Sequence, residues 1–344
     1  MLKHLIATAK PFLRWFVMGI TLFFLLKTFK DRFAEITHIS IDSRAWLILA
    51  IALVCTLLAH IWSAWVWTGI LKIFQIQISL LEGICVYLVT NIAKYLPGNV
   101  WHFYGRIKAI RQQGSSIGLA TLSVVLEPLL MAASALLIAV VSTSFGLISS
   151  EFNPLVFGGQ IVALLVVLIG IHPRVLNPIL QKLSKGKSDR ASVAIRDVEV
   201  RKRSNQPIST QTAANAVAET QTQNHTEALQ TYPLLPFLGE IGFVLFRGVG
   251  FLFTVMAIQT IVPGQIPLLI SAFSIAWLLG LVVPGAPGGI GIFEATAIAL
   301  LPQTIFPRAN ILLAVALYRV ISILAEAIAA VMGWGFEKVA ISKG

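Results

Sequence analysis

The stretch Val282–Glu294 constrains this chain most, because it places two prolines and four glycines inside an otherwise apolar region. Proline lacks the amide donor of a helix and glycine is conformationally loose, so an uninterrupted helix cannot pass through this stretch. Within a bilayer, broken backbone is tolerated only where protein buries it or where it lines a water-filled cavity. In a membrane protein, the stretch would therefore mark a functional cavity.

The chain as a whole has the composition of a polytopic membrane protein. Of its 344 residues, 57% are hydrophobic and 12% are charged, with a mean hydropathy of +0.84, whereas soluble domains average about 25% charged residues. Two apolar runs, 79–96 and 266–283, end at Pro-Gly pairs. We therefore predict an all-α membrane protein. Its full-length spans, each near the roughly 20 residues that a helix needs, are expected at about 12–29, 45–70, 117–142, 155–172, 237–262 and 309–335.

The basic residues favour two re-entrant hairpins, which enter the membrane and return on the same side. A full crossing at 79–96 would place the basic segment around Arg106 and the basic insert after residue 172 outside, against the positive-inside tendency. If 79–96 returns, the topology becomes six full crossings plus two re-entrant hairpins in the cytoplasmic membrane, with both termini cytoplasmic. Four basic residues disagree, because they would face outward: Lys27, Lys30, Arg32 and Arg44.

Residues 173–235 separate two membrane halves, 1–172 and 236–344. The first part of this insert is basic and the second is rich in Gln, Thr, Asn and Ala, so we expect a disordered cytoplasmic linker. A regulatory or lipid-docking tail is the alternative.

The two halves resemble each other. In each half an apolar run leads to a Pro-Gly break and then to a span with a charged residue near its middle, Glu127 or Arg319. Three crossings separate the hairpins, so they should enter from opposite faces. This pattern is typical of an inverted repeat with a transporter site near the membrane midplane; chance similarity of two Pro-Gly breaks is the alternative.

The first break mixes aromatic residues, which suit the headgroup level, with cations that suit phosphate oxygens. Such a mixture could hold a phospholipid headgroup; the alternative is an interfacial belt with snorkelling cations. A packing role is the alternative for the histidine in this group. The candidate binding residues are Lys94, Tyr95, Pro97, Gly98, Asn99, Trp101, His102 and Arg106.

The second break precedes a helix expected to begin near Phe293. Backbone amides at a helix start present a partial positive charge to an anion, although glycines also permit close helix packing. Glu294 could cap this helix or pair with a cation. The candidates are Pro284, Gly285, Gly288, Gly289, Gly291 and Glu294.

Charged residues inside spans need a partner or a watery cavity, because each costs about 2.5–3.5 kcal/mol at mid-depth. Glu127 and Arg319 lie at comparable depths from opposite sides, so we predict that they pair with each other. Arg247 and Glu326 are the next candidates, whereas Glu240 lies too close to a span end to carry weight. Structural ion pairs between spans are the alternative.

The sequence offers little support for catalysis or for a cofactor. It contains no Walker motif, no Gly-x-Ser-x-Gly elbow, no His-Glu-x-x-His motif and no cysteine spacing for a metal. An intramembrane lipid enzyme that uses Glu127 or His102 as a base is the alternative. The net charge of +11 fits cytoplasmic loops and anionic lipids, and we expect no nucleic-acid binding.

Three segments resemble the lysylphosphatidylglycerol synthase transmembrane-region proteins, whose larger members join a lipid-translocating membrane domain to a cytoplasmic aminoacyl transferase. They are Lys94–Trp101 with Gly105-Arg106, Pro284–Glu294, and Leu317-Tyr318-Arg319. The resemblance covers nearly all of the chain apart from 173–235. It implies a role in moving or presenting lipids, with the two hairpins forming the cavity, and it adds Tyr318 to the candidates.

Because no transferase domain follows Gly344, we expect no synthesis of aminoacyl-lipid by this chain. The expected function is translocation of anionic phospholipids, and the expected partners are membrane lipids. The alternatives are an intramembrane lipid or polyprenyl-phosphate transferase, or a structural partner of a separately encoded transferase.

Overall fold

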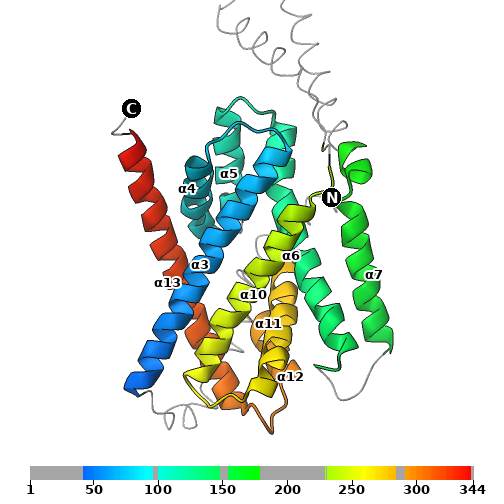
Figure 1. Cartoon of the computed structure of the whole chain (residues 1–344), viewed down its shortest axis with the longest axis vertical. Helices are drawn as coiled ribbons and strands as arrows, with labels where there is room; N and C mark the ends of the chain where they lie inside the picture. The colour runs from blue at the N-terminus through cyan, green and yellow to red at the C-terminus, as the bar shows by residue number, and fades with distance from the viewer. Residues whose placement is uncertain are drawn as a thin grey trace, which may run out of the picture.

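The computed structural model describes residues 42–95, 100–147, 154–178, 229, 231–283 and 291–341, with side chains described to Phe336. All regular structure in these ranges is helical (Figure 1). The predicted all-α fold is therefore confirmed. Five helices of the described part are long and apolar enough to cross a membrane, in agreement with a polytopic membrane protein.

Long helices run between the two ends of the molecule (Figure 1). They match five of the six predicted crossings, and the sixth, 12–29, lies outside the described residues. Side chains cap two of them, since Asp42 accepts a hydrogen bond from the Ala45 amide at 2.7 Å and Ser116 accepts one from the Leu119 amide at 3.2 Å. These helices are α3 (Ser43–Ile73), α6 (Ile117–Ser144), α7 (Pro154–Gly170), α10 (Leu234–Met256) and α13 (Arg308–Ile341).

Two shorter helix pairs lie at opposite ends of the molecule (Figure 1). The upper hairpin consists of α4 (Leu80–Asn91), the 3₁₀ turn η1 (Ile92–Tyr95) and α5 (Trp101–Gln112). The lower hairpin consists of α11 (Ile266–Val282), which follows the 3₁₀ turn η3 (Pro263–Gln265), and α12 (Ile292–Leu300). In each hairpin the two helices pack against each other.

The described helices end on either side of the two predicted Pro-Gly pairs, which themselves lie outside the described residues. The α11 helix ends at Val282, and Val283 is extended, with a ψ of 116°. By length and composition, Pro263–Val282 is long enough to span a membrane, whereas α7, with 17 residues, is shorter. The tips of both hairpins fall outside the described residues, and with them the candidates Pro97, Gly98, Asn99, Pro284, Gly285, Gly288 and Gly289.

The core is built around the contact between α3 and α10. A methyl group added at Gly239 would lie 2.6 Å from Val66, and one at Gly250 would lie 2.5 Å from the Thr56 hydroxyl oxygen. These glycines therefore let the two helices approach closely, as small residues do in membrane proteins.

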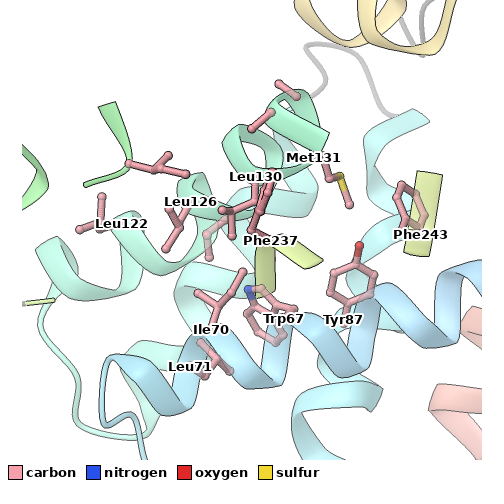
Figure 2. Close-up of a cluster of buried hydrophobic side chains, with 14 of the residues drawn as sticks. Trp67, Ile70, Leu71, Tyr87, Leu122, Leu126, Leu130, Met131, Phe237 and Phe243 are labelled. Atoms are coloured by element: carbon pink, nitrogen blue, oxygen red, sulfur yellow. The ribbon is translucent and has the colours of Figure 1, made fainter. Parts of the chain in front are cut away.

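Apolar side chains from several helices fill the two ends of the bundle. Figure 2 shows the larger cluster, in which Trp67 of α3 packs with Leu126 and Leu130 of α6 and with Phe237 of α10. At the other end Phe251, Phe273, Phe293 and Tyr318 form a second cluster. Their ring centroids are 5.5–5.8 Å apart, so α10, α11, α12 and α13 are joined around one aromatic group.

The segment between α7 and α10 is anchored where the structure describes it. Residues 173–178 are helical, and the Asn177 side chain exchanges two hydrogen bonds with the Leu229 backbone, at 2.7 and 3.1 Å. The helical residues begin at 173, the residue at which the sequence analysis placed the start of the linker. The rest of the predicted linker, 179–228, lies outside the described residues.

Candidate functional site

A cavity of about 460 Å³ lies between the two hairpins and the helices α3, α6, α10 and α13. Four cationic side chains and two carboxylates line it among the described residues, which leaves an excess of positive charge. It brings together nine residues that the sequence analysis singled out: Lys94, Tyr95, His102, Arg106, Glu127, Arg247, Tyr318, Arg319 and Glu326.

The first ion pair of the cavity joins the upper hairpin to α6. Arg106 of α5 donates from Nη1 to Oε2 of Glu127, and the two side chains are only 2% and 3% exposed. The Tyr87 hydroxyl donates to the other oxygen, Oε1, at 2.5 Å, and Ser63 donates to the same atom at 3.4 Å. The guanidinium carbon also lies 3.7 Å from the centroid of the Tyr87 ring. This sealed pair is thus almost fully buried, although both residues line the wall of the cavity.

The second ion pair joins the lower hairpin to α13. Arg319 donates from Nη2 to Oε1 of Glu294 at 2.6 Å, and the side chains are 27% and 7% exposed. The other oxygen of Glu294 accepts the Gly291 amide at 2.5 Å. Gly291 has a φ of 86°, which favours glycine at this position. Glu294 therefore both caps the start of α12 and pairs with a cation.

The predicted pair between Glu127 and Arg319 is wrong. Each residue instead pairs within its own half, Glu127 with Arg106 and Arg319 with Glu294. The physical reason is the fold of the hairpins. The returning arm of each hairpin packs against the next long helix, so it supplies an opposite charge there.

A third cluster joins the two halves through Glu326 of α13. Its Oε1 lies 2.6 Å from Lys94 Nζ and 3.2 Å from His60 Nε2. The same His60 nitrogen lies 3.2 Å from Arg247 Nη1, and the Tyr318 hydroxyl donates to the Arg247 carbonyl at 3.0 Å. The sequence analysis named Arg247 and Glu326 but missed His60, whose only signal is that it is a polar residue within an apolar run.

Glu240 is a second residue whose importance the sequence analysis missed. Its side chain lies in α10 at 0% exposure, and neither carboxylate oxygen has a hydrogen-bond partner within the described chain. It is close enough to Glu127 and Arg106 to interact with both electrostatically. Its position near a predicted span end concealed this burial.

The remaining described candidates lie at the rim or pack internally. Trp101 begins α5 and is 49% exposed. His102 is buried, with its ring centroid 3.9 Å from that of Phe103, and its Nδ1 has no partner among the described residues. No cluster of potential metal ligands occurs in the described ranges.

The helical architecture agrees with a comparison to known families. No curated protein sequence matches the chain. The model of the family described as "Lysylphosphatidylglycerol synthase TM region" matches residues 12–330, which covers most of the chain, including the segment between α7 and α10. The chain therefore belongs to the lysylphosphatidylglycerol synthase transmembrane-region family.

Proposed function

We propose that this protein moves or presents anionic phospholipids across the cytoplasmic membrane. The headgroup enters the cavity between the hairpins, and the acyl chains stay in the bilayer. The observation that carries this proposal is the excess of cations in the cavity lining, where four cations face two carboxylates among the described residues. Arginine and lysine suit phosphate oxygens, and a volume of about 460 Å³ is in the usual range for a small-molecule site.

The arrangement of the hairpins supports an inverted repeat with two re-entrant segments. The upper and lower hairpins lie at opposite ends of the bundle (Figure 1), and each is joined to the following long helix by one ion pair. Broken helices at corresponding positions of two inverted halves are a common way to build a site with access from alternating sides. Arg111 lies in the last turn of α5 and Arg174 follows the end of α7, so we assign the upper end, where α13 also ends, to the cytoplasm.

Cysteine labelling tests this topology. In a variant lacking Cys55 and Cys85, cysteines at Lys72 and Gln113 flank the upper hairpin, and cysteines at Gly264 and Thr304 flank the lower one. With a membrane-impermeant maleimide, we expect the first two to react from the cytoplasmic side only and the other two from the opposite side only. If Gly264→Cys and Thr304→Cys react from different sides, the lower hairpin crosses the membrane and is not re-entrant.

Lipid translocation is tested most directly in liposomes. We expect purified protein to accelerate the transbilayer movement of fluorescent phosphatidylglycerol, measured by quenching the outer leaflet with dithionite. Arg106→Gln should abolish this movement. Lys108→Gln, which removes an exposed cation from the same helix, should leave it close to the wild-type rate. Unchanged movement with Arg106→Gln would contradict the proposal.

The same assay separates transport from the proposed alternative of an intramembrane transferase. Transport leaves the mass of the lipid unchanged, whereas a transferase changes it. We propose that the protein is a transporter and not an enzyme, and that membrane lipids are its partners, together with a separately encoded lipid-modifying transferase. Mass spectrometry of the recovered lipid would overturn this choice if a new product appeared.

A further inference from the structure

Two buried carboxyl groups, those of Glu240 and Glu127, interact electrostatically at one side of the bundle. Glu240 of α10 has no hydrogen-bond partner for either oxygen within the described chain, and it interacts electrostatically with Glu127 of α6. Burying an ionised carboxylate that has no partner costs several kcal/mol of folding free energy. A neutral, protonated Glu240 would avoid this cost, whereas the Glu127 side chain already has Arg106 as its counterion.

The negative charge of Glu127 depends on one cation. The cationic contact of Glu127 is Arg106, and the other contacts are the hydroxyls of Tyr87 and Ser63. Arg106 also lines the cavity, and its remaining contacts with Thr90 and Asn91 are long, at 3.4 Å each. A phosphate in the cavity thus competes with Glu127 for the same guanidinium.

We propose that Glu127 is a proton-binding site coupled to anionic lipid, with a neutral Glu240 beside it. While Arg106 is paired with Glu127, Glu127 carries the negative charge. When the phosphate of a headgroup becomes the counterion of Arg106, a proton from bulk water binds a carboxylate oxygen of Glu127. The charge of the site is unchanged, because one anion and one proton enter together. This proposal rests on the proposed function, since it requires an anionic lipid in the cavity.

The surrounding groups are compatible with this exchange. Tyr87 from α4 and Ser63 from α3 can keep hydrogen bonds to a protonated Glu127, because hydroxyls both donate and accept. On the side of Arg106, Lys94 and His102 are within electrostatic reach. Both would favour arrival of a phosphate when charged, and both disfavour additional positive charge.

The lower hairpin provides an internal contrast. Glu294 keeps the hydrogen bond from the Gly291 amide when Arg319 moves away, and Arg319 is 27% exposed. Water and a backbone dipole can therefore stabilise the Glu294 carboxylate without a proton. Proton uptake is expected from the first pair and not from the second.

Linkage gives the sign of the pH dependence. If lipid binding takes up one proton, protons and lipid favour each other's binding. Affinity for the anionic lipid should then be highest at low pH and should fall by up to about tenfold for each unit that the pH rises. The affinity for a zwitterionic lipid with the same phosphate would also fall as the pH rises only if that phosphate reaches Arg106.

Isothermal titration calorimetry of detergent-solubilised protein with dihexanoyl phosphatidylglycerol tests the proposal. Comparing buffers of different ionisation enthalpy yields both Kd and the number of protons taken up. We expect uptake approaching one proton per bound lipid for the wild type. Glu127→Gln should bind with much less proton uptake than the wild type, and its Kd should depend much less on pH. Glu294→Gln should retain the uptake even if its affinity changes.

The outcomes separate two kinds of failure. Lipid binding without proton uptake, at any value between about pH 6 and pH 9, would overturn the proton site and leave the proposed function standing. No binding of the anionic lipid would overturn both. Glu240→Gln imitates the neutral acid, so it should keep the wild-type melting temperature and the uptake. Loss of either in a variant that still binds lipid would show that Glu240 is ionised, against the assignment.

Discussion

An ion pair joins each hairpin to the long helix that follows it, but the two pairs differ in which partner the hairpin supplies and in how exposed the side chains are. In the upper hairpin the returning arm carries the arginine, and in the lower hairpin it carries the glutamate. The partners are separated by 21 residues in one half and 25 in the other. Exposure is 2% and 3% for Arg106 and Glu127, but 27% and 7% for Arg319 and Glu294.

This difference teaches that equivalent positions in a repeat can have different energetics. A sealed pair is costly to break, because removing either partner leaves a buried charge without compensation. An open pair is screened by water and is worth much less. We infer that Arg319 exchanges partners readily, whereas Arg106 releases Glu127 only when another anion replaces it.

The largest expected effect comes from removing the arginine of the sealed pair. Arg106→Gln should destabilise the protein by about 3–5 kcal/mol, because Glu127 then remains buried without its cation. Arg319→Gln should cost about 1 kcal/mol or less, because its pair is partly exposed and Glu294 keeps the Gly291 amide. Chemical denaturation in detergent, followed by tryptophan fluorescence, measures both.

A double variant provides the control for this comparison. Arg106→Gln combined with Glu127→Gln removes both charges, so it should recover most of the stability that the single arginine variant loses, without restoring lipid movement. Equal losses for Arg106→Gln and Arg319→Gln would mean that exposure does not distinguish the two halves.

The sequence predicts the helices well, because a bilayer imposes strong rules on the backbone. Each described long helix lies within a few residues of its predicted run, except that α10 ends at Met256 and not at residue 262, and α13 continues to Ile341 and not to residue 335. Glycine and proline also mark the two breaks, since no helix tolerates them at that density. These features depend on local chain chemistry, which a single sequence contains.

The partners of the buried charges could not be predicted in the same way. Matching depth suggested that Glu127 faces Arg319, but depth does not determine which helix packs alongside. The helix α3 is apolar on nearly all sides, so periodicity does not show which of its faces His60 occupies. The energetic cost of a charge within a span could have made Glu240 a stronger candidate, because any carboxylate within an apolar run needs an explanation.

An intermediate effect is expected at the contact between the halves. Lys94 of the upper hairpin lies 2.6 Å from Glu326 of α13 and is 25% exposed, so its environment lies between those of the other two pairs. A double-mutant cycle with Lys94→Gln and Glu326→Gln should give a coupling energy of about 1–3 kcal/mol. Thermal unfolding of the four proteins in detergent measures it.

The alternative outcome at this contact is equally informative. A coupling near zero would indicate that His60, 3.2 Å from the same oxygen, replaces Lys94 as the partner of Glu326. The two halves would then be joined through α3 and not through the tip of the upper hairpin. Repeating the cycle with His60→Gln would identify that partner.

A small effect on stability should also come from the backbone of the open pair. Gly291→Ala places a side chain at a φ of 86°, which costs about 1–2 kcal/mol, and it weakens the amide contact that supports Glu294. Gly335→Ala, in α13 with open space around the added methyl, is the matched control and should be neutral or slightly stabilising.

If the Glu294 carboxylate depends on the Gly291 amide, Gly291→Ala should also make lipid binding release or take up protons at the second pair. Calorimetry of Gly291→Ala in the Glu127→Gln background isolates that contribution, since the first pair no longer titrates there. Proton exchange in this background would show that the two halves differ only in how their carboxylates are supported, whereas its absence would show that exposure to water alone keeps Glu294 ionised.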